Sequence, residues 1–148
     1  MSQDRIESDV LIEAPVERVW TLLTEGEHLG SWFGDAGAEV DLRPGGAMEL
    51  RWAEHGAVRA RVERVEEPSA FAFRWASGME HEPTDGASTL VEFTLAREGD
   101  GTRVSVVETG FASLDVPAEE RRAKFEGNVE GWEFELGELA RYATRVGV

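Results

Sequence analysis

Cysteine is absent from the 148-residue chain, which excludes disulfide bonds and cysteine-ligated metal sites. Lysine occurs once, at Lys124, so a phosphate-binding loop that ends in Gly-Lys-Ser/Thr cannot form. Positive charge is scarce, because 15 Lys and Arg residues stand against 30 Asp and Glu residues, a formal net charge of −15. A surface this acidic repels phosphate backbones and anionic lipid headgroups, so we expect no nucleic-acid partner and no membrane partner.

Long apolar runs are also missing. No stretch approaches the roughly 18 residues that a bilayer-spanning helix needs. The first five residues are polar, where a secretory signal would need a cationic start and an apolar stretch. These features predict a cytoplasmic protein. The length and the hydrophobic content of 41% predict one globular domain that covers residues 1–148.

Motifs for metal, nucleotide and hydrolase chemistry are absent too. The three histidines, His28, His55 and His81, are far apart in the sequence and show no ligand spacing. The chain contains neither a Gly-x-Ser-x-Gly elbow nor a Gly-x-Gly-x-x-Gly turn. We therefore expect no metal, no cofactor, and neither a serine hydrolase nor a dinucleotide-binding protein.

The hydrophobic pattern changes period twice along the chain. Residues 5–13 alternate as a strand, Pro15 begins a helix that runs to about Thr24, and a short helical turn follows before Gly34. From residue 36 to residue 110 the period is two, with Gly, Pro and Asp between the runs. This segment predicts six antiparallel strands, the first with Val40 and Leu42 on one face.

The last 30 residues return to a helical period. Pro117 is placed to begin a helix, and an apolar stripe then recurs at steps of three and four residues over about 45 Å. The order of strand, two short helices, six strands and long helix predicts an α+β fold with helices packed on one face of a curved sheet. The stripe consists of Phe125, Val129, Trp132, Leu136, Leu139, Ala143 and Val146.

Aromatic side chains gather on the predicted inner faces. Space between a bent sheet and a long helix is where a small apolar or aromatic molecule would bind, although the same side chains could simply fill the core. Two more aromatic residues, Trp32 and Phe33, are expected near the mouth of such a cavity. The candidate lining is Trp52, Phe71, Phe73, Trp75, Phe93, Phe125 and Trp132.

Glu108 is the most informative carboxylate, because it continues the inward phase of a strand. It could act as a general acid or base or anchor a ligand hydroxyl or amine; alternatively, it is hydrogen-bonded within the protein or exposed at the rim. Arg121 and Asn128 lie at the edge of the helical stripe, where hydrogen bonds to a neighbouring strand are favoured over ligand contacts. Phe134 lies opposite the stripe and, beside Tyr142, suggests a homodimer or partner contact.

Several short segments together resemble the START-like, or SRPBCC, superfamily, and within it the family related to the C-terminal domain of the activator of the 90-kDa heat-shock-protein ATPase. The resemblance covers nearly the whole chain and implies a helix-grip fold, in which a seven-stranded antiparallel sheet wraps around the C-terminal helix and leaves a cavity. The segments are Ile12 to Trp20, Ser31 to Gly34, Pro44 to Leu50, Pro68 to Trp75, Thr102 to Phe111, and Gly131-Trp132.

The resemblance leaves three functions open, since the superfamily includes lipid and hormone carriers, aromatic cyclases and ribonuclease-like plant proteins. We favour a protein that binds a hydrophobic or aromatic small molecule between the sheet and the helix. The alternative is a polyketide-cyclase-like or hydrolase-like enzyme that uses a cavity carboxylate such as Glu108. A chaperone-associated interaction protein is the third.

Overall fold

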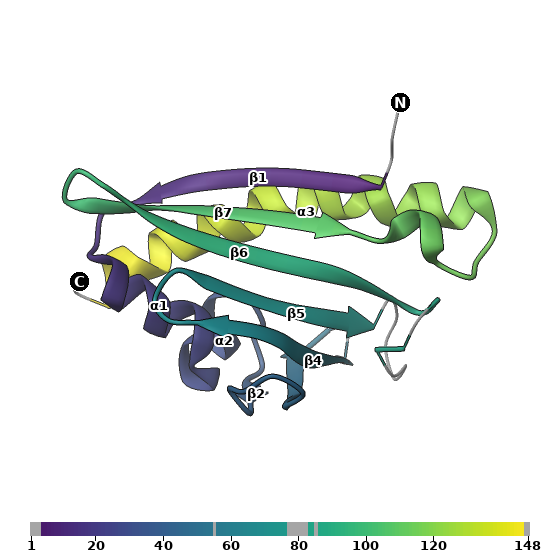
Figure 1. Cartoon of the computed structure of the whole chain (residues 1–148), viewed down its shortest axis with the longest axis horizontal. Coiled ribbons are helices and arrows are strands. Elements are labelled where there is room, and N and C mark those ends of the chain that lie inside the picture. Colours follow the sequence, from purple (N-terminus) through teal and green to yellow (C-terminus); the bar gives the residue numbers. More distant parts are fainter. Residues whose placement is uncertain (1–3, 55, 77–82, 85, 147–148) are drawn as a thin grey trace.

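The computed structural model describes residues 4–54, 56–76, 83–84 and 86–146. Within these ranges, seven antiparallel strands form one sheet in the order β1-β7-β6-β5-β4-β3-β2, and three α-helices accompany it (Figure 1). The bounds are β1 (Arg5–Ile12), α1 (Val16–Thr24), α2 (Gly26–Trp32), β2 (Ala38–Val40), β3 (Ala47–Trp52), β4 (Gly56–Glu66), β5 (Ala70–Ala76), β6 (Ser88–Glu98), β7 (Gly101–Thr109), a 3-10 turn η1 (Phe111–Ser113) and α3 (Ala118–Arg145).

The predicted α+β helix-grip architecture is confirmed in element order and type. One detail of the first hairpin is wrong. Leu42 lies outside β2, which ends at Val40, and its side chain is exposed. The reason is that Asp41 and Arg43 begin the turn before β3: the Arg43 N–H donates to the Asp41 carbonyl at 2.8 Å, so the chain leaves the strand there.

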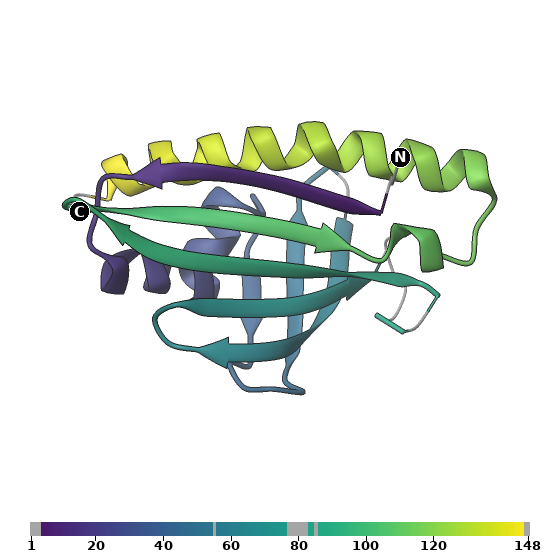
Figure 2. The same cartoon turned by 45° about the horizontal axis from the view of Figure 1, so that its top comes forward.

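The sheet bends strongly between its two ends. Figure 2 shows β2 and β3 running across the direction of β1, β6 and β7. A register shift between Val62 and Arg64 interrupts the β4–β5 pairing, and such a bulge increases bending and twist. The bend makes the inner face concave, and the inward residues of β3 to β7 converge on it.

A close backbone approach holds α2 against the start of β2. A Cβ atom added at Gly30 would lie 2.5 Å from the backbone of Gly37, so only glycine allows this contact. Helix α2 then ends at Trp32, and Phe33 follows directly as its C-cap. The contact therefore positions Phe33 over the concave face.

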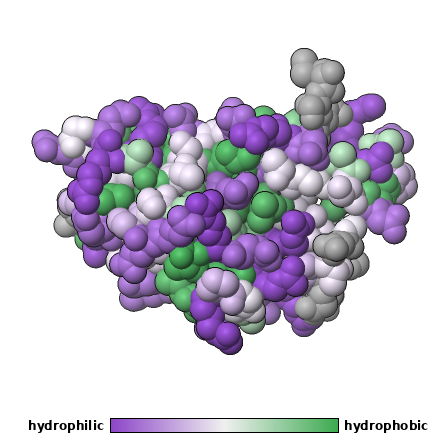
Figure 3. All heavy atoms as spheres, in the orientation of Figure 1, coloured by the Kyte–Doolittle hydropathy of each residue, from purple (hydrophilic) through white to green (hydrophobic). Residues whose placement is uncertain are grey.

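Helix α3 lies alongside β1, as both views show (Figures 1 and 2). Pro117 precedes it, and Glu119 and Glu120 occupy its first turn, where negative charge suits the helix dipole. No described helix is both long enough and apolar enough to cross a membrane. Hydrophilic side chains cover most of the surface in Figure 3, with hydrophobic ones in separate groups.

Candidate functional site

An aromatic cluster occupies the space between α2, the concave face and α3. Phe33 lies near its middle, with its ring centroid 5.4 Å from that of Trp132 and 5.6 Å from those of Trp52 and Trp75. The rings of Trp75 and Trp132 are stacked at 5.7 Å. Ring contacts link eight predicted lining residues into one network: Trp32, Phe33, Trp52, Phe71, Phe73, Trp75, Phe93 and Trp132.

The ninth predicted aromatic residue, Phe125, is separate from this network. It is partly buried, and its ring contacts that of Phe111 at 5.3 Å instead. The expectation that Trp32 and Phe33 lie near a cavity mouth is wrong, since both side chains are buried. Trp32 is drawn inward because its indole N–H donates to the Leu22 carbonyl at 2.7 Å. Trp52 and Trp75 are the partly buried members of the cluster.

Glu108 is fully buried beneath the cluster, at 0% exposure. Its Oε2 atom accepts hydrogen bonds from the Trp75 indole at 2.9 Å and the Thr89 hydroxyl at 2.5 Å. Its Oε1 atom accepts one from the Trp132 indole at 2.8 Å. The side-chain amide of Asn128 donates to both oxygens, at 3.0 and 3.1 Å. Four side chains on β5, β6 and α3 therefore converge on one carboxylate of β7.

This arrangement decides between the alternatives for Glu108. An indole N–H can only donate, so the two tryptophans require acceptors, and both carboxylate oxygens are occupied. Buried polar groups that are completely paired stabilise one packing of their surroundings. Of the alternatives considered for Glu108, the structure shows a side chain that is hydrogen-bonded within the protein. These hydrogen bonds link α3 to the sheet, and they leave neither carboxylate oxygen for a substrate proton.

The other polar candidates also bond within the protein. Asn128 bonds to a strand residue, as predicted, whereas Arg121 donates to the carbonyls of Leu114 and Val116 in the segment before α3. The prediction that Phe134 and Tyr142 together mark a contact surface is wrong. Phe134 is 62% exposed, but Tyr142 is buried, with its hydroxyl 2.7 Å from His28 Nδ1. A homodimer through Phe134 stays a prediction.

The two halves of α3 differ in burial. The buried helix residues all belong to its second half: Trp132, Leu136, Leu139, Tyr142 and Ala143. Over residues 118–131, the stripe residues Phe125 and Val129 are only partly buried. Asn128 and Trp75, on facing sides, are also only partly buried. The apolar stripe of α3 is therefore buried more deeply along its second half than along its first.

Glu135, which sequence reasoning missed, lies one turn beyond Trp132 on α3. Its Oε1 atom is buried, and no described group donates a hydrogen bond to it. Burial, followed by the negative charges of Glu138 and Asp35, raises the pKa of the Glu135 carboxyl to about 8. The helical spacing could have placed Glu135 beside Leu139 at the edge of the stripe. The missing partner depends on the tertiary structure.

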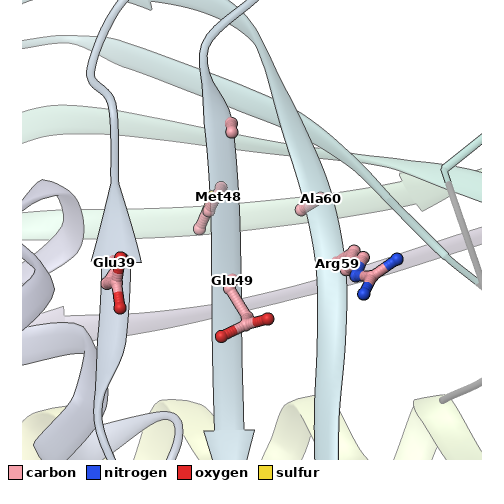
Figure 4. A pocket seen from close by; sticks show the side chains of 6 residues that line it. Glu39, Met48, Glu49, Arg59 and Ala60 are labelled. Carbon is pink, nitrogen blue, oxygen red and sulfur yellow. The ribbon is translucent and has the colours of Figure 1, made fainter. Parts of the chain in front are cut away.

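A hollow of about 260 Å³ lies over β2, β3 and β4, away from the aromatic cluster (Figure 4). Glu39 and Glu49 project there from neighbouring strands, and Arg51 binds both, at 3.2 and 2.6 Å. Within the described ranges, no three His, Asp or Glu residues are placed to hold a metal ion. His55 and His81 lie outside those ranges.

Comparisons with known proteins agree with this fold. The family model described as Activator of Hsp90 ATPase homolog 1-like protein matches residues 13–144. The comparison with curated protein sequences gave no match. Protein MLL2253 from Mesorhizobium loti is similar in structure, with 20% identity, coverage of 97% of this chain and 99% of that one, and a TM-score of 0.78.

Two other similar structures belong to longer chains. CalU16 from Micromonospora echinospora is 24% identical, with coverage of 94% of this chain and 75% of that one, and a TM-score of 0.69. DynU16, from the dynemicin biosynthetic locus, is also 24% identical, with coverage of 94% of this chain and a TM-score of 0.74. This chain spans only 46% of DynU16. At these identities the likeness shows the fold alone.

Proposed function

The chain belongs to the Activator of Hsp90 ATPase homolog 1-like family, and we propose that it binds an aromatic or apolar small molecule between the first half of α3 and the concave face of the sheet. The observation that carries this proposal is the unequal burial of α3. The stripe is buried at Trp132, Leu136, Leu139 and Ala143, whereas Phe125 and Val129 are only partly buried. A planar apolar molecule placed there would bury additional surface of both.

The aromatic cluster supports an aromatic ligand in particular. Trp52 and Trp75 are its partly buried members, and both rings pack against Phe33. Aromatic rings favour offset-stacked or edge-to-face contacts, which contribute about 0.5–1.5 kcal/mol beyond the area they bury. A ligand ring against Trp75 would extend the stack that Phe33, Trp75 and Trp132 already form.

The enzymatic alternative finds less support. It requires a cavity carboxylate that can exchange a proton with a substrate, and Glu108 was the candidate. All the hydrogen bonds that its carboxylate accepts in the structure come from protein donors. Two of these donors are the indole N–H groups of Trp75 and Trp132, which can only donate. No specific observation favours a chaperone-associated role, so a binding protein is the function that we propose.

The test uses the indole N–H signals of the five tryptophans in a ¹⁵N–¹H correlation spectrum during titration with 2-naphthol. We expect the signals of Trp52, Trp75 and Trp132 to move. The Trp20 signal should stay in place, because Trp20 belongs to α1 and its ring contacts Phe71. Movement of Trp20 alone, or no movement at all, would overturn the proposal.

Two matched variants locate the site on α3. Phe125→Ala should weaken 2-naphthol binding about tenfold, because it removes a ring that we place against the ligand; tenfold corresponds to about 1.4 kcal/mol. Phe134→Ala makes the same change on the exposed side of the helix and should leave the affinity unchanged. Equal effects of the two substitutions would place the ligand elsewhere.

A further inference from the structure

We propose that Glu135 is the polar anchor of this ligand site and that the ligand is an aromatic amine, whose ammonium group binds Oε1 of Glu135. This inference rests on the proposed function and names the chemical class of the ligand. Four observations carry it: the unpartnered oxygen, the position of Glu135 beside the aromatic cluster, the open space at Gly131 one turn earlier, and the surrounding charge.

The unpartnered oxygen is the first observation. Oε1 of Glu135 is buried, and nothing in the described part of the chain donates a hydrogen bond to it. A buried carboxylate oxygen without a donor is costly, and native proteins rarely retain one without a reason. A ligand N–H would supply the missing donor.

The position of Glu135 relative to the aromatic cluster is the second observation. Phe33 stacks on Trp132, one turn before Glu135 on α3. Two hydrogen bonds hold the segment from Phe33 to Asp35 against the end of β3. The Trp52 indole donates to the Phe33 carbonyl at 3.0 Å, and the Ala53 N–H donates to Asp35 Oδ1 at 2.7 Å. Glu135 therefore lies where this segment meets α3, at the rim of the cluster.

Open space at Gly131, one turn before Glu135, is the third observation. Gly131 precedes Glu135 by four residues, so the two positions are neighbours on one face of α3. A Cβ atom built on Gly131 would meet nothing within 4 Å. Any larger residue at this position would occupy part of the space between Asn128 and Glu135. The glycine therefore leaves open space one turn before Glu135, from which a ligand group would have to displace the atoms that cover Oε1.

Charge is the fourth observation, and it favours a cation over an anion. The negative charges nearest to Glu135 are Glu138, on the next turn of α3, and Asp35, in the segment after α2. Arg141 pairs with Glu138, and His28 of α2 contacts α3 further along, at Tyr142. The chain as a whole carries −15.

The protonation state of Glu135 gives a signature that a neutral ligand would not produce. The pKa of its carboxyl is raised to about 8, so the carboxyl is mostly protonated at pH 7 in the free protein. An ammonium group at Oε1 favours the ionised form. Binding at pH 7 should therefore release up to about one proton per ligand.

The experiment compares three probes that share one ring system: 2-naphthylmethylamine, 2-naphthalenemethanol and 2-naphthoate. Isothermal titration calorimetry at pH 7, in two buffers with different ionisation enthalpies, gives both the affinity and the number of protons released. We expect the amine to bind at least about tenfold more tightly than the alcohol and the naphthoate to bind weakest. Only the amine should release a proton.

Two charge-matched variants assign the effect to a residue. Glu135→Gln should lower the affinity for the amine to that for the alcohol and abolish proton release. Glu133→Gln removes a carboxylate from an exposed position two residues away, and it should keep both the affinity for the amine and the proton release. Proton release by the native protein is an independent readout if Glu135→Gln folds poorly.

The outcomes separate this inference from the proposed function. Equal binding of amine and alcohol, or a preference for the amine that survives Glu135→Gln, would overturn the role of Glu135 and leave the aromatic site standing. No binding of any probe would overturn both proposals.

Discussion

Two glutamates beside the aromatic cluster differ in how their carboxylates are satisfied. Glu108 is completely buried and accepts hydrogen bonds from four side chains. Glu135 is less buried, yet its Oε1 atom has no partner among the described residues. Burial alone therefore does not identify the group that is free to bind a ligand. That group is identified by how few hydrogen-bond donors in the protein already face its oxygens.

The largest expected effect is on stability at Glu108. Glu108→Gln keeps the shape but replaces one acceptor oxygen by an N–H₂ group that faces indole and hydroxyl donors. We expect a loss of about 3 kcal/mol in the free energy of unfolding, measured by urea denaturation. A value within about 0.5 kcal/mol of the native protein would contradict the structural role of this carboxylate.

A smaller loss is expected when one donor to Glu108 is removed. Trp132→Phe keeps a ring against Phe33 but deletes the indole N–H that bonds Oε1 at 2.8 Å. The free energy of unfolding should fall by about 1–2 kcal/mol, from the lost hydrogen bond together with lost ring contact. Urea denaturation measures it, and an unchanged midpoint would show that the hydrogen bond contributes nothing.

Substitution of Glu135 should raise the free energy of unfolding instead of lowering it, and the size of this gain should depend on pH. Its pKa is raised from 4.5 to about 8, so the unfolded chain ionises before the folded protein does. The native protein is therefore progressively destabilised as the pH rises from 4.5 to 8. Glu135→Gln removes this penalty. Because the group is partly exposed, we expect a gain of roughly 1–2 kcal/mol above pH 8 after allowing for solvent screening.

The control for this prediction is internal to the pH series. The gain from Glu135→Gln should disappear near pH 3, well below the pKa of 4.5 in the unfolded chain, where the carboxyl is protonated in both states. Chemical denaturation at about pH 3, 7 and 9 follows the difference. A gain that is constant with pH would indicate a packing effect and not the removal of a costly charge.

The smallest expected effect is at Asp35. Asp35→Asn removes a negative charge that acts on Glu135 but retains the oxygen that accepts the Ala53 N–H. The pKa of Glu135 should fall slightly, because burial and Glu138 contribute more to its elevation than Asp35 does. A ¹³C-detected NMR titration of the side-chain carboxyl measures this change. A rise in the pKa would mean that Asp35 acts mainly through structure.

The sequence predicted the fold well because hydrophobic period and turn residues are local signals. The alternation of Val104, Val106 and Glu108 correctly placed Glu108 on the inner face. It could not reveal the donors from Trp75 and Asn128, which lie 33 and 20 residues away. The boundary at Val40 was missed because Leu42 continues the apolar alternation into a turn.

The candidate site was predictable only in its aromatic composition. Ring contacts join eight of the nine predicted residues, whereas Phe125 packs on Phe111 instead. Glu135 was not identified from the sequence, because it is one of 30 acidic residues in the chain. What distinguishes it is the absence of a donor at Oε1 in the described structure, which no local pattern encodes.

The most direct test of this account is a crystal structure of the protein with 2-naphthylmethylamine bound. The account predicts the naphthalene ring against Trp75 and the first half of α3, with the ammonium nitrogen about 3 Å from Oε1 of Glu135 and the hydrogen bonds of Glu108 intact. An ammonium group bonded to Glu108, or a ring bound away from α3, would contradict it.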